Sequence, residues 1–143
     1  MQPLMMANIN DVYRKQGVLT ASPIELIVML YDGLKKDLLL TQMAIKNKNM
    51  ETAHKKLINA QDIVSELINS LDFGFPISND LFALYDFMLR TLEEINAKKD
   101  ADLIPDLMEI VDSLKETWRE VADIQRSKLA LQSDEQFVKG RAR

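Results

Sequence analysis

Apolar residues recur every three or four positions in four stretches of this chain, and that spacing constrains the fold more than any other feature. Side chains spaced in this way share one face of an α-helix. No stretch sustains the alternation typical of a β-strand, so only helices are predicted. The four stripes consist of Ile27, Leu30, Leu34, Leu38, Thr41 and Ile45; Met50, Ala53, Leu57, Ala60, Val64, Leu67 and Leu71; Leu81, Leu84, Met88, Leu92 and Ile95; and Leu103, Leu107, Ile110, Leu114, Thr117, Val121 and Ile124.

Helix-start and helix-stop residues bracket each stripe. Ser22 precedes Pro23 as an N-cap precedes a proline at the first helical position, and Glu25 completes a capping box. Ser78 offers a later start, and Asp100 or Asp102 can cap the last helix. The sequence therefore predicts helices over residues 23–47, from residue 50 to before residue 74, from about residue 79 to about residue 98, and from about residue 103 to about residue 131.

Short connections between long helices predict their relative directions. Helices joined in this way lie antiparallel to their neighbours, which predicts an all-α, up-down, antiparallel four-helix bundle with a short N-terminal helical segment packed on it. That segment is the weakly amphipathic stretch of residues 5–16, closed by Gly17. We expect three parts: residues 1–17 as a partly mobile cap, residues 18–131 as the bundle, and residues 132–143 as a flexible basic tail.

Composition excludes several functional classes. The chain has no cysteine and a net charge of −4, so disulfide or thiolate sites are impossible and nucleic acid is a poor partner. No apolar stretch is long enough for membrane insertion. No nucleophilic triad or phosphate-binding loop occurs. We expect a cytoplasmic protein that is not an enzyme and needs no cofactor or metal.

A metal-dependent enzyme stays open as an alternative at one place. Glu51 and His54 have the Glu-x-x-His spacing by which bundle proteins place two ligands on one helix face. The chain contains one histidine, whereas such centres draw this motif from two helices. An exposed surface histidine is the interpretation we favour.

Apolar residues also lie outside the four stripes, beyond what the seam of a bundle needs. An irregular bundle that buries more of each helix would explain part of this surplus. Contiguous exposed apolar surface otherwise marks a site for a partner, and amphipathic helices fit grooves between helices. The residues point to a helix-binding module. The surplus residues are Leu26, Met29, Leu39, Leu40, Met43, Ala44, Ile58, Ile63, Ile68, Phe82, Tyr85, Phe87 and Leu89.

Several short motifs then give a specific resemblance. They are Thr20-Ala21-Ser22-Pro23, Glu25-Leu26-Ile27, Met29-Leu30-Tyr31-Asp32-Gly33, Asn79, Leu81, Leu84-Tyr85-Asp86-Phe87-Met88, Leu114 and Trp118. In this order and spacing the chain resembles the FliS-type flagellin export chaperone family. The resemblance implies a cytoplasmic bundle that binds the C-terminal helical segment of flagellin, prevents premature polymerisation and aids delivery to the flagellar type III secretion apparatus.

The resemblance also suggests which residues take part in binding. It implies that the N-terminal segment contributes to the binding region and is displaced by flagellin, which makes it a movable cover. Other flagellar export or regulatory proteins are further partners, and an unfilled groove could let two copies associate weakly. A generic helical adaptor for another secretion or regulatory protein is the alternative. The candidate protein-binding residues are Ile9, Tyr13, Leu26, Met29, Leu30, Tyr31, Leu81, Leu84, Tyr85 and Met88.

Three motif residues are assigned to the bundle itself. Trp118 is expected to anchor the last helix. Asp32 and Asp86 are expected to make helix-terminal or inter-helix polar contacts and not to touch flagellin.

Overall fold

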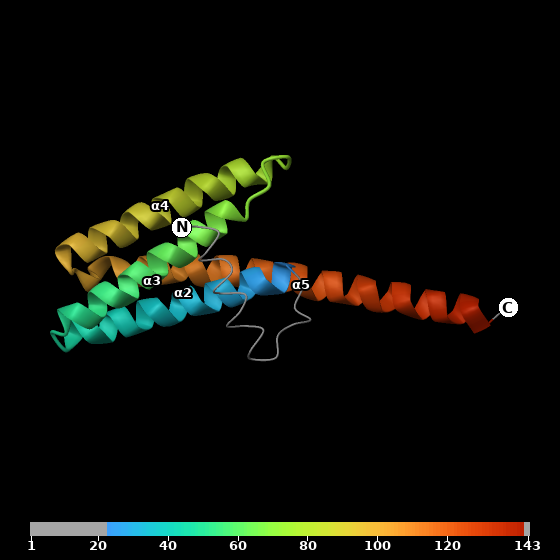
Figure 1. The fold of residues 1–143 in the computed structure, drawn as a ribbon, viewed down its shortest axis with the longest axis horizontal. Coiled ribbons are helices and arrows are strands. Elements are labelled where there is room, and N and C mark those ends of the chain that lie inside the picture. Colours follow the sequence, from blue (N-terminus) through green and yellow to red (C-terminus); the bar gives the residue numbers. More distant parts are fainter. Residues whose placement is uncertain (1–22, 142–143) are drawn as a thin grey trace.

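The computed structural model describes residues 23–141, and the side chains of residues 23–132 within that range. This part of the chain is all-helical, as predicted. Labelled as in Figure 1, its elements are α2 (Pro23–Lys46), α3 (Met50–Asn69), α4 (Ile77–Lys98), the short 3-10 turn η1 (Ala101–Leu103) and α5 (Ile104–Arg141). The expected N-terminal helical segment and the Ser22 cap lie outside the described residues.

Local polar contacts explain where the helices begin and end. The Asn49 side chain accepts a hydrogen bond from the Thr52 amide at 3.2 Å, which caps α3. Asp100 accepts one from the Asp102 amide at 2.9 Å and so starts η1 ahead of α5. Ser78 differs from the prediction: it lies inside the first turn of α4, where its hydroxyl donates to the Asp72 carbonyl at 2.6 Å.

Successive helices run in opposite directions (Figure 1), and α2 has a neighbouring helix on two sides. It packs against α3 on one side and α5 on the other, while α4 packs against α3. Between α2 and α3, Gly33 leaves room for the Ile63 side chain, whose Cδ1 lies 3.4 Å from the position of a Cβ. Contact between α4 and α5 is sparse. The bundle is therefore closed on three sides and open between α4 and α5.

The core forms along the sides that are closed. Burial of each large apolar side chain stabilises the fold by about 1.5–3 kcal/mol. Of the surplus apolar residues of α2, Ala44 is buried, Leu26, Met29 and Leu40 are half-buried, and Leu39 and Met43 are exposed, so the irregular-bundle interpretation explains only part of the surplus on this helix. The core cluster comprises Leu30, Tyr31, Leu34, Leu38, Leu57, Ala60, Val64, Leu67, Tyr85, Met88, Leu92, Ile95, Ile104, Leu107 and Val111.

The fourth predicted stripe is not a core seam along its whole length. Val121 is 37% exposed and Ile124 is 56% exposed, whereas Ile104, Val111 and Ala122, on a neighbouring face of α5, are buried. The difference arises because α4 does not close over α5, so the stripe faces the open side of the bundle. It becomes a wall of the surface described next.

The last helix is longer than predicted, since α5 continues to Arg141 and not to about residue 131. Its final third projects beyond the bundle (Figure 1). The division of the chain into cap, bundle and tail remains a prediction.

Candidate binding surface between α4 and α5

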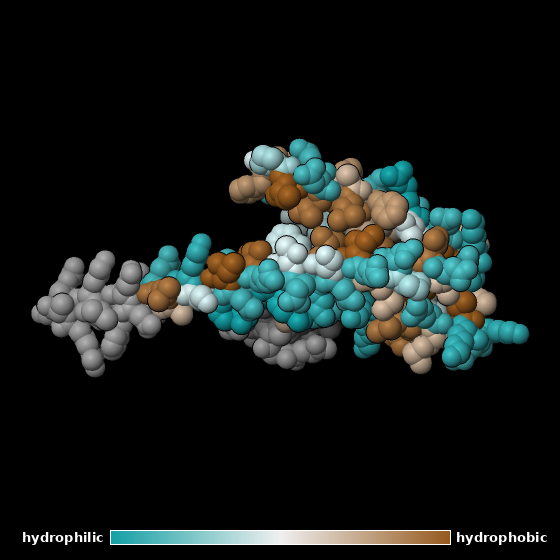
Figure 2. Space-filling model, turned by 180° about the vertical axis from the view of Figure 1, so that it is seen from behind, coloured by the Kyte–Doolittle hydropathy of each residue, from teal (hydrophilic) through white to brown (hydrophobic). Residues whose placement is uncertain are grey.

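An apolar groove runs along the open side of the bundle. Its best-defined part is a cavity of about 230 Å³ between α4 and α5. Phe87, 50% exposed, stands on the α4 wall, and Leu107 and Ile110 stand on the α5 wall. Figure 2 shows apolar surface gathered over α4 and the adjoining face of α5, hollowed between the start of α4 and the projecting part of α5. The cavity is lined by Phe87, Thr91, Glu94, Leu103, Asp106, Leu107 and Ile110.

The groove continues from this cavity toward the N-terminal end of α4. Along α5 the apolar face extends through Leu114 to Val121 and Ile124. Toward the α3–α4 connection lie four more exposed apolar side chains, among which the Phe73 and Phe82 rings meet edge to face at 6.0 Å. An exposed apolar surface of this extent is typical of a partner site. The four are Phe73, Phe75, Ile77 and Phe82.

Acidic side chains border the groove. Asp106 on α5 and Glu94 on α4 line the cavity, and both are exposed. Asp106 forms no ion pair with another described residue, whereas Glu94 binds Lys98 at 2.9 Å. In Figure 2 hydrophilic surface follows the outer edge of α5. The exposed Glu109, Glu116 and Glu120 lie on the side of α5 turned away from its apolar stripe.

A buried polar cluster joins the two groove walls to α2. The hydroxyls of Tyr31 on α2 and Tyr85 on α4 are hydrogen-bonded at 2.5 Å, and their ring centroids lie 6.5 Å apart. Trp118, on α5, packs against the same core cluster, and its side chain lowers the pKa of both tyrosines, which opposes the effect of burial. Burial raises the pKa of each tyrosine above its ordinary value. The cluster thus ties α4 and α5 together through their shared neighbour, and Trp118 anchors α5 as predicted.

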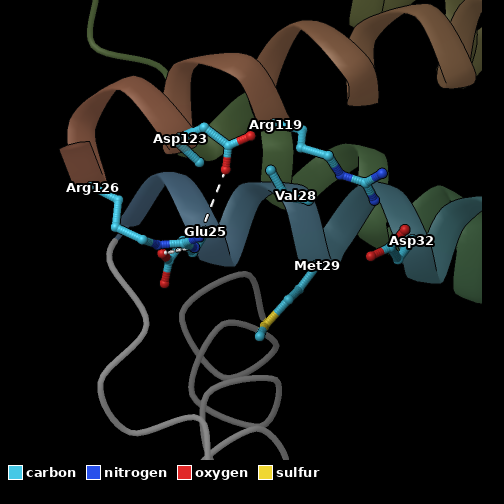
Figure 3. Close-up of a pocket in the computed structure, with 8 residues that line it drawn as sticks. Glu25, Val28, Met29, Asp32, Arg119, Asp123 and Arg126 are labelled. Carbon is cyan, nitrogen blue, oxygen red and sulfur yellow. Dashed lines mark hydrogen bonds and ion pairs between the residues drawn. The ribbon is translucent and has the colours of Figure 1, made fainter.

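A second concavity, of about 340 Å³, lies between the N-terminal part of α2 and α5. Its walls are charged: Arg126 contacts Glu25 at 2.5 Å and Asp123 at 3.7 Å. Figure 3 shows these side chains bridging the two helices, whereas Met29 points away from α5. The concavity is a polar seam between helices, and it offers a partner less apolar surface than the α4–α5 groove does.

The predicted binding residues fall into three groups. Leu30, Tyr31, Tyr85 and Met88 are enclosed in the core, with at most 5% of each exposed. Leu26, Met29, Leu81 and Leu84 are half-buried. Ile9 and Tyr13 lie outside the described residues. The four enclosed residues can affect binding only by supporting the residues around them. The four half-buried residues can contact a partner directly.

Residues that the sequence did not single out for binding supply most of the groove. Phe87 was noted as surplus, but Ile110, Val121 and Ile124 were assigned to a core seam. Phe73 and Phe75 follow no helical spacing because they stand in the α3–α4 connection. The sequence could still have pointed to them, because polar residues are usual in short connections and these two positions are phenylalanines.

The acidic motif residues behave largely as expected. Asp32 on α2 pairs with Lys115 on α5 at 2.6 Å, which is an inter-helix contact. Asp86 pairs with Arg90 one turn later in α4 at 2.7 Å, which is a contact within one helix and not the helix-terminal or inter-helix contact that was expected. At the proposed metal motif, Glu51 pairs with Lys55 at 3.4 Å and the exposed His54 meets Asn96 at 3.1 Å. Within the described residues no group of three or more His, Asp or Glu side chains is arranged to hold a metal ion.

Comparison with known proteins decides the family. Residues 5–125 match the family described as "Flagellar protein FliS". The chain belongs to the FliS family. The "Flagellar secretion chaperone FliS" of Bacillus subtilis (strain 168) is 32% identical over 123 residues, which cover 86% of this chain and 92% of that protein. The FliS family match stops at residue 125, so it includes the groove but not the projecting end of α5.

Other FliS chaperones agree at similar identity. The protein of the same description from Vibrio cholerae serotype O1 is 30% identical over 103 residues, covering 71% of this chain and 76% of that protein. The one from Campylobacter jejuni is 32% identical over 113 residues, covering 78% and 88%. Membership places this chain among flagellar export chaperones. None of the described helices is long and apolar enough to span a membrane.

Proposed function

We propose that this protein is a cytoplasmic export chaperone that binds the C-terminal segment of flagellin. Binding would prevent premature polymerisation and aid delivery to the flagellar type III secretion apparatus, without catalysis or a cofactor. The observation that carries the proposal is the open apolar groove between α4 and α5 in a protein of a flagellar chaperone family.

The groove suits a segment that folds as it binds. A helical bundle open on one side can accept an amphipathic helix, whose apolar face would lie on Phe87 and Ile110. A segment without fixed structure spends several kcal/mol of its contact energy on becoming ordered. Extensive contact with moderate affinity would follow, and that combination lets a chaperone release its cargo for export.

The direct test is titration calorimetry with flagellin from the same organism, full-length and with its C-terminal segment removed. We expect a one-to-one complex with the full-length protein and no detectable binding by the shortened one. Equal binding of both forms would contradict the proposed mode. Failure of both to bind, with retained affinity for another amphipathic helix, would favour a generic helical adaptor.

We further propose how the sequence-predicted residues contribute. Leu81 and Leu84 would contact the cargo from the foot of the α4 wall, and Tyr31, Tyr85, Leu30 and Met88 would support that wall from the core. Ile9 and Tyr13 would belong to a movable cover of the binding region. A Tyr13→Ala variant is expected to change flagellin affinity and N-terminal proteolysis, and an unchanged variant would remove the cover from the account.

A further inference from the structure

The position of α4 over the open side of the bundle depends on few contacts. In Figure 1 α4 and α5 lie closest at the turn that joins them and separate toward the start of α4. That turn contains Lys99, whose φ of 50° lies in the left-handed region. α4 packs along α3 but makes sparse contact with α5. A helix held in this way can pivot near Lys99, because residues at the ends of elements absorb changes in backbone angles.

The other wall of the groove, α5, is fixed on α2. The two helices pack closely, and ion pairs join them along their length. Asp32 pairs with Lys115 at 2.6 Å, and Glu25 pairs with Arg126 at 2.5 Å. A contact that fixes α4 on α2 therefore also fixes the distance between α4 and α5.

A hydrogen bond joins α4 to α2 away from the pivot. It links the hydroxyls of Tyr85 and Tyr31 at 2.5 Å, and both side chains are buried. A second hydrogen bond of α4, between Asn96 and His54 of α3 at 3.1 Å, lies within one turn of Lys99. Apolar packing is non-directional and tolerates small shifts, whereas a hydrogen bond fixes the distance between two atoms. The tyrosine bond is therefore the contact that restrains the angle of α4.

The distance from the pivot makes this restraint effective. Tyr85 lies about 21 Å from Lys99 along the helix axis. A rotation of about 10° at the pivot would move Tyr85 by roughly 4 Å, which is more than a hydrogen bond tolerates. The same rotation would move the start of α4 by roughly 6 Å, about half the diameter of an α-helix. The bond thus controls the wide end of the groove, toward the start of α4.

We propose that Tyr31 and Tyr85 are positioning residues that set the width of the α4–α5 groove. With their hydroxyls bonded, α4 stands at a fixed distance from α5 and the groove is ready to receive a helix. Without the bond, α4 swings outward about Lys99 and the groove has no single width. This role rests on the proposed function for the identity of the cargo, whereas the spacing of the two walls is a property of the free protein.

Distances between spin labels on the two walls test this role. The chain has no cysteine, so Ala83→Cys on α4 and Glu120→Cys on α5, both exposed, place one label on each wall. Double electron–electron resonance on the full chain should give one narrow distance distribution. Tyr31→Phe, Tyr85→Phe and the double variant should each broaden this distribution and lengthen its mean by about 3 Å or more.

A loss of stability alone would not produce this pattern. All three tyrosine variants lose the same hydrogen bond, so the widening should be equal in the three. Their stabilities should differ, because only the single variants leave a buried hydroxyl unpaired. Leu57→Ala is the control, since Leu57 is fully buried on α3. Its truncation should destabilise the fold and leave the distance distribution unchanged.

Flagellin binding supplies a second measurement. A wall without a fixed position must be ordered when a helix binds, and that ordering lowers affinity. Calorimetric titration with full-length flagellin should show the double tyrosine variant binding about threefold or more weakly than the parent. Leu57→Ala should bind as the parent does.

Three results would overturn the proposal. The first is an unchanged distance distribution in all three tyrosine variants, which would leave the pair a packing role alone. The second is an equal widening in Leu57→Ala, which would show a general loosening of the bundle. The third is unchanged flagellin affinity in a variant whose groove has widened. If the parent does not bind flagellin, the proposed function fails, and the distances still decide whether the pair sets the width.

Discussion

The Tyr31–Tyr85 pair buries two hydroxyl groups in the core, where each one needs a hydrogen-bond partner. Each hydroxyl is buried, and the two are bonded at 2.5 Å. Tyr85→Phe would leave the Tyr31 hydroxyl without this partner and should lower the free energy of unfolding by about 1–3 kcal/mol. Urea denaturation followed by the fluorescence of the single tryptophan, Trp118, measures it.

The double variant Tyr31→Phe/Tyr85→Phe separates the hydrogen bond from the packing. With both hydroxyls removed, no buried group is left unpaired within the pair, so the loss should be smaller than the sum of the two single losses. A strictly additive result would show that the hydroxyls act independently.

Asp37 makes stability depend on pH. It is buried against α3, and burial raises its pKa to about 6 from an ordinary value of 3.8, with Lys56 and Lys36 opposing the shift. The folded state thus holds this proton more tightly than the unfolded state. Its favourable contribution is fully present below about pH 4 and is lost as pH rises through 6.

Asp37→Asn should therefore stabilise the protein above pH 6 by roughly 2 kcal/mol and have little effect near pH 4. Denaturation at both pH values measures the difference. Asp112→Asn is the control, because Asp112 is half-exposed in a surface pair with Lys35 and such pairs contribute about 1 kcal/mol or less. An equal, pH-independent gain at both positions would argue against desolvation of Asp37.

At the scale of residues, the sequence predicted which side chains share a helix face better than it predicted how exposed each side chain is. Leu34, Leu57 and Leu92 were assigned to the core by spacing and are fully buried. Tyr31 and Tyr85 were assigned to a binding surface, but the structure encloses them. Spacing identifies which residues share a face, and only the position of the opposite helix decides whether that face is covered.

At the scale of elements, one residue in the α2–α3 connection has a backbone conformation that is unfavourable for a residue with a side chain. Lys48 has φ 58°, in the left-handed region where a side chain costs about 1 kcal/mol and glycine costs little. Lys48→Gly should stabilise the protein by about 0.5–1 kcal/mol.

Lys46→Gly, two residues earlier in the last turn of α2, is the matched comparison. A glycine there should destabilise the helix by up to about 1 kcal/mol. Thermal denaturation of both variants measures the contrast in sign. Destabilisation of equal size at both positions would contradict the backbone argument.

Helix starts and stops could be predicted closely where local chemistry sets them. The expected first helix ended at residue 47, and α2 ends at Lys46. The end of α5 could not be predicted in this way, because no glycine or proline stands between Leu131 and Lys139 to stop it. The start of α4 also differed, since Ser78 uses its hydroxyl on Asp72 rather than as a cap.

At the scale of the whole molecule, the fold class was predictable and the opening between α4 and α5 was not. Short connections fix the direction of successive helices, but they do not fix how closely the last two approach. The sequence therefore placed the groove along the first and third helices, whereas the structure has it between the third and fourth. That the surplus apolar residues mark a partner site stays a prediction.

The central claim is that the α4–α5 groove holds the C-terminal segment of flagellin. Phe87→Ala removes a half-exposed side chain from the groove, and Met43→Ala removes a 59% exposed side chain from the α2 surface, outside the residues that line the groove. Calorimetric titration of both variants with full-length flagellin compares the two surfaces directly. We predict a loss of affinity of about tenfold or more for Phe87→Ala and none for Met43→Ala. Unchanged affinity in the Phe87 variant, or an equal loss in both, would contradict the account.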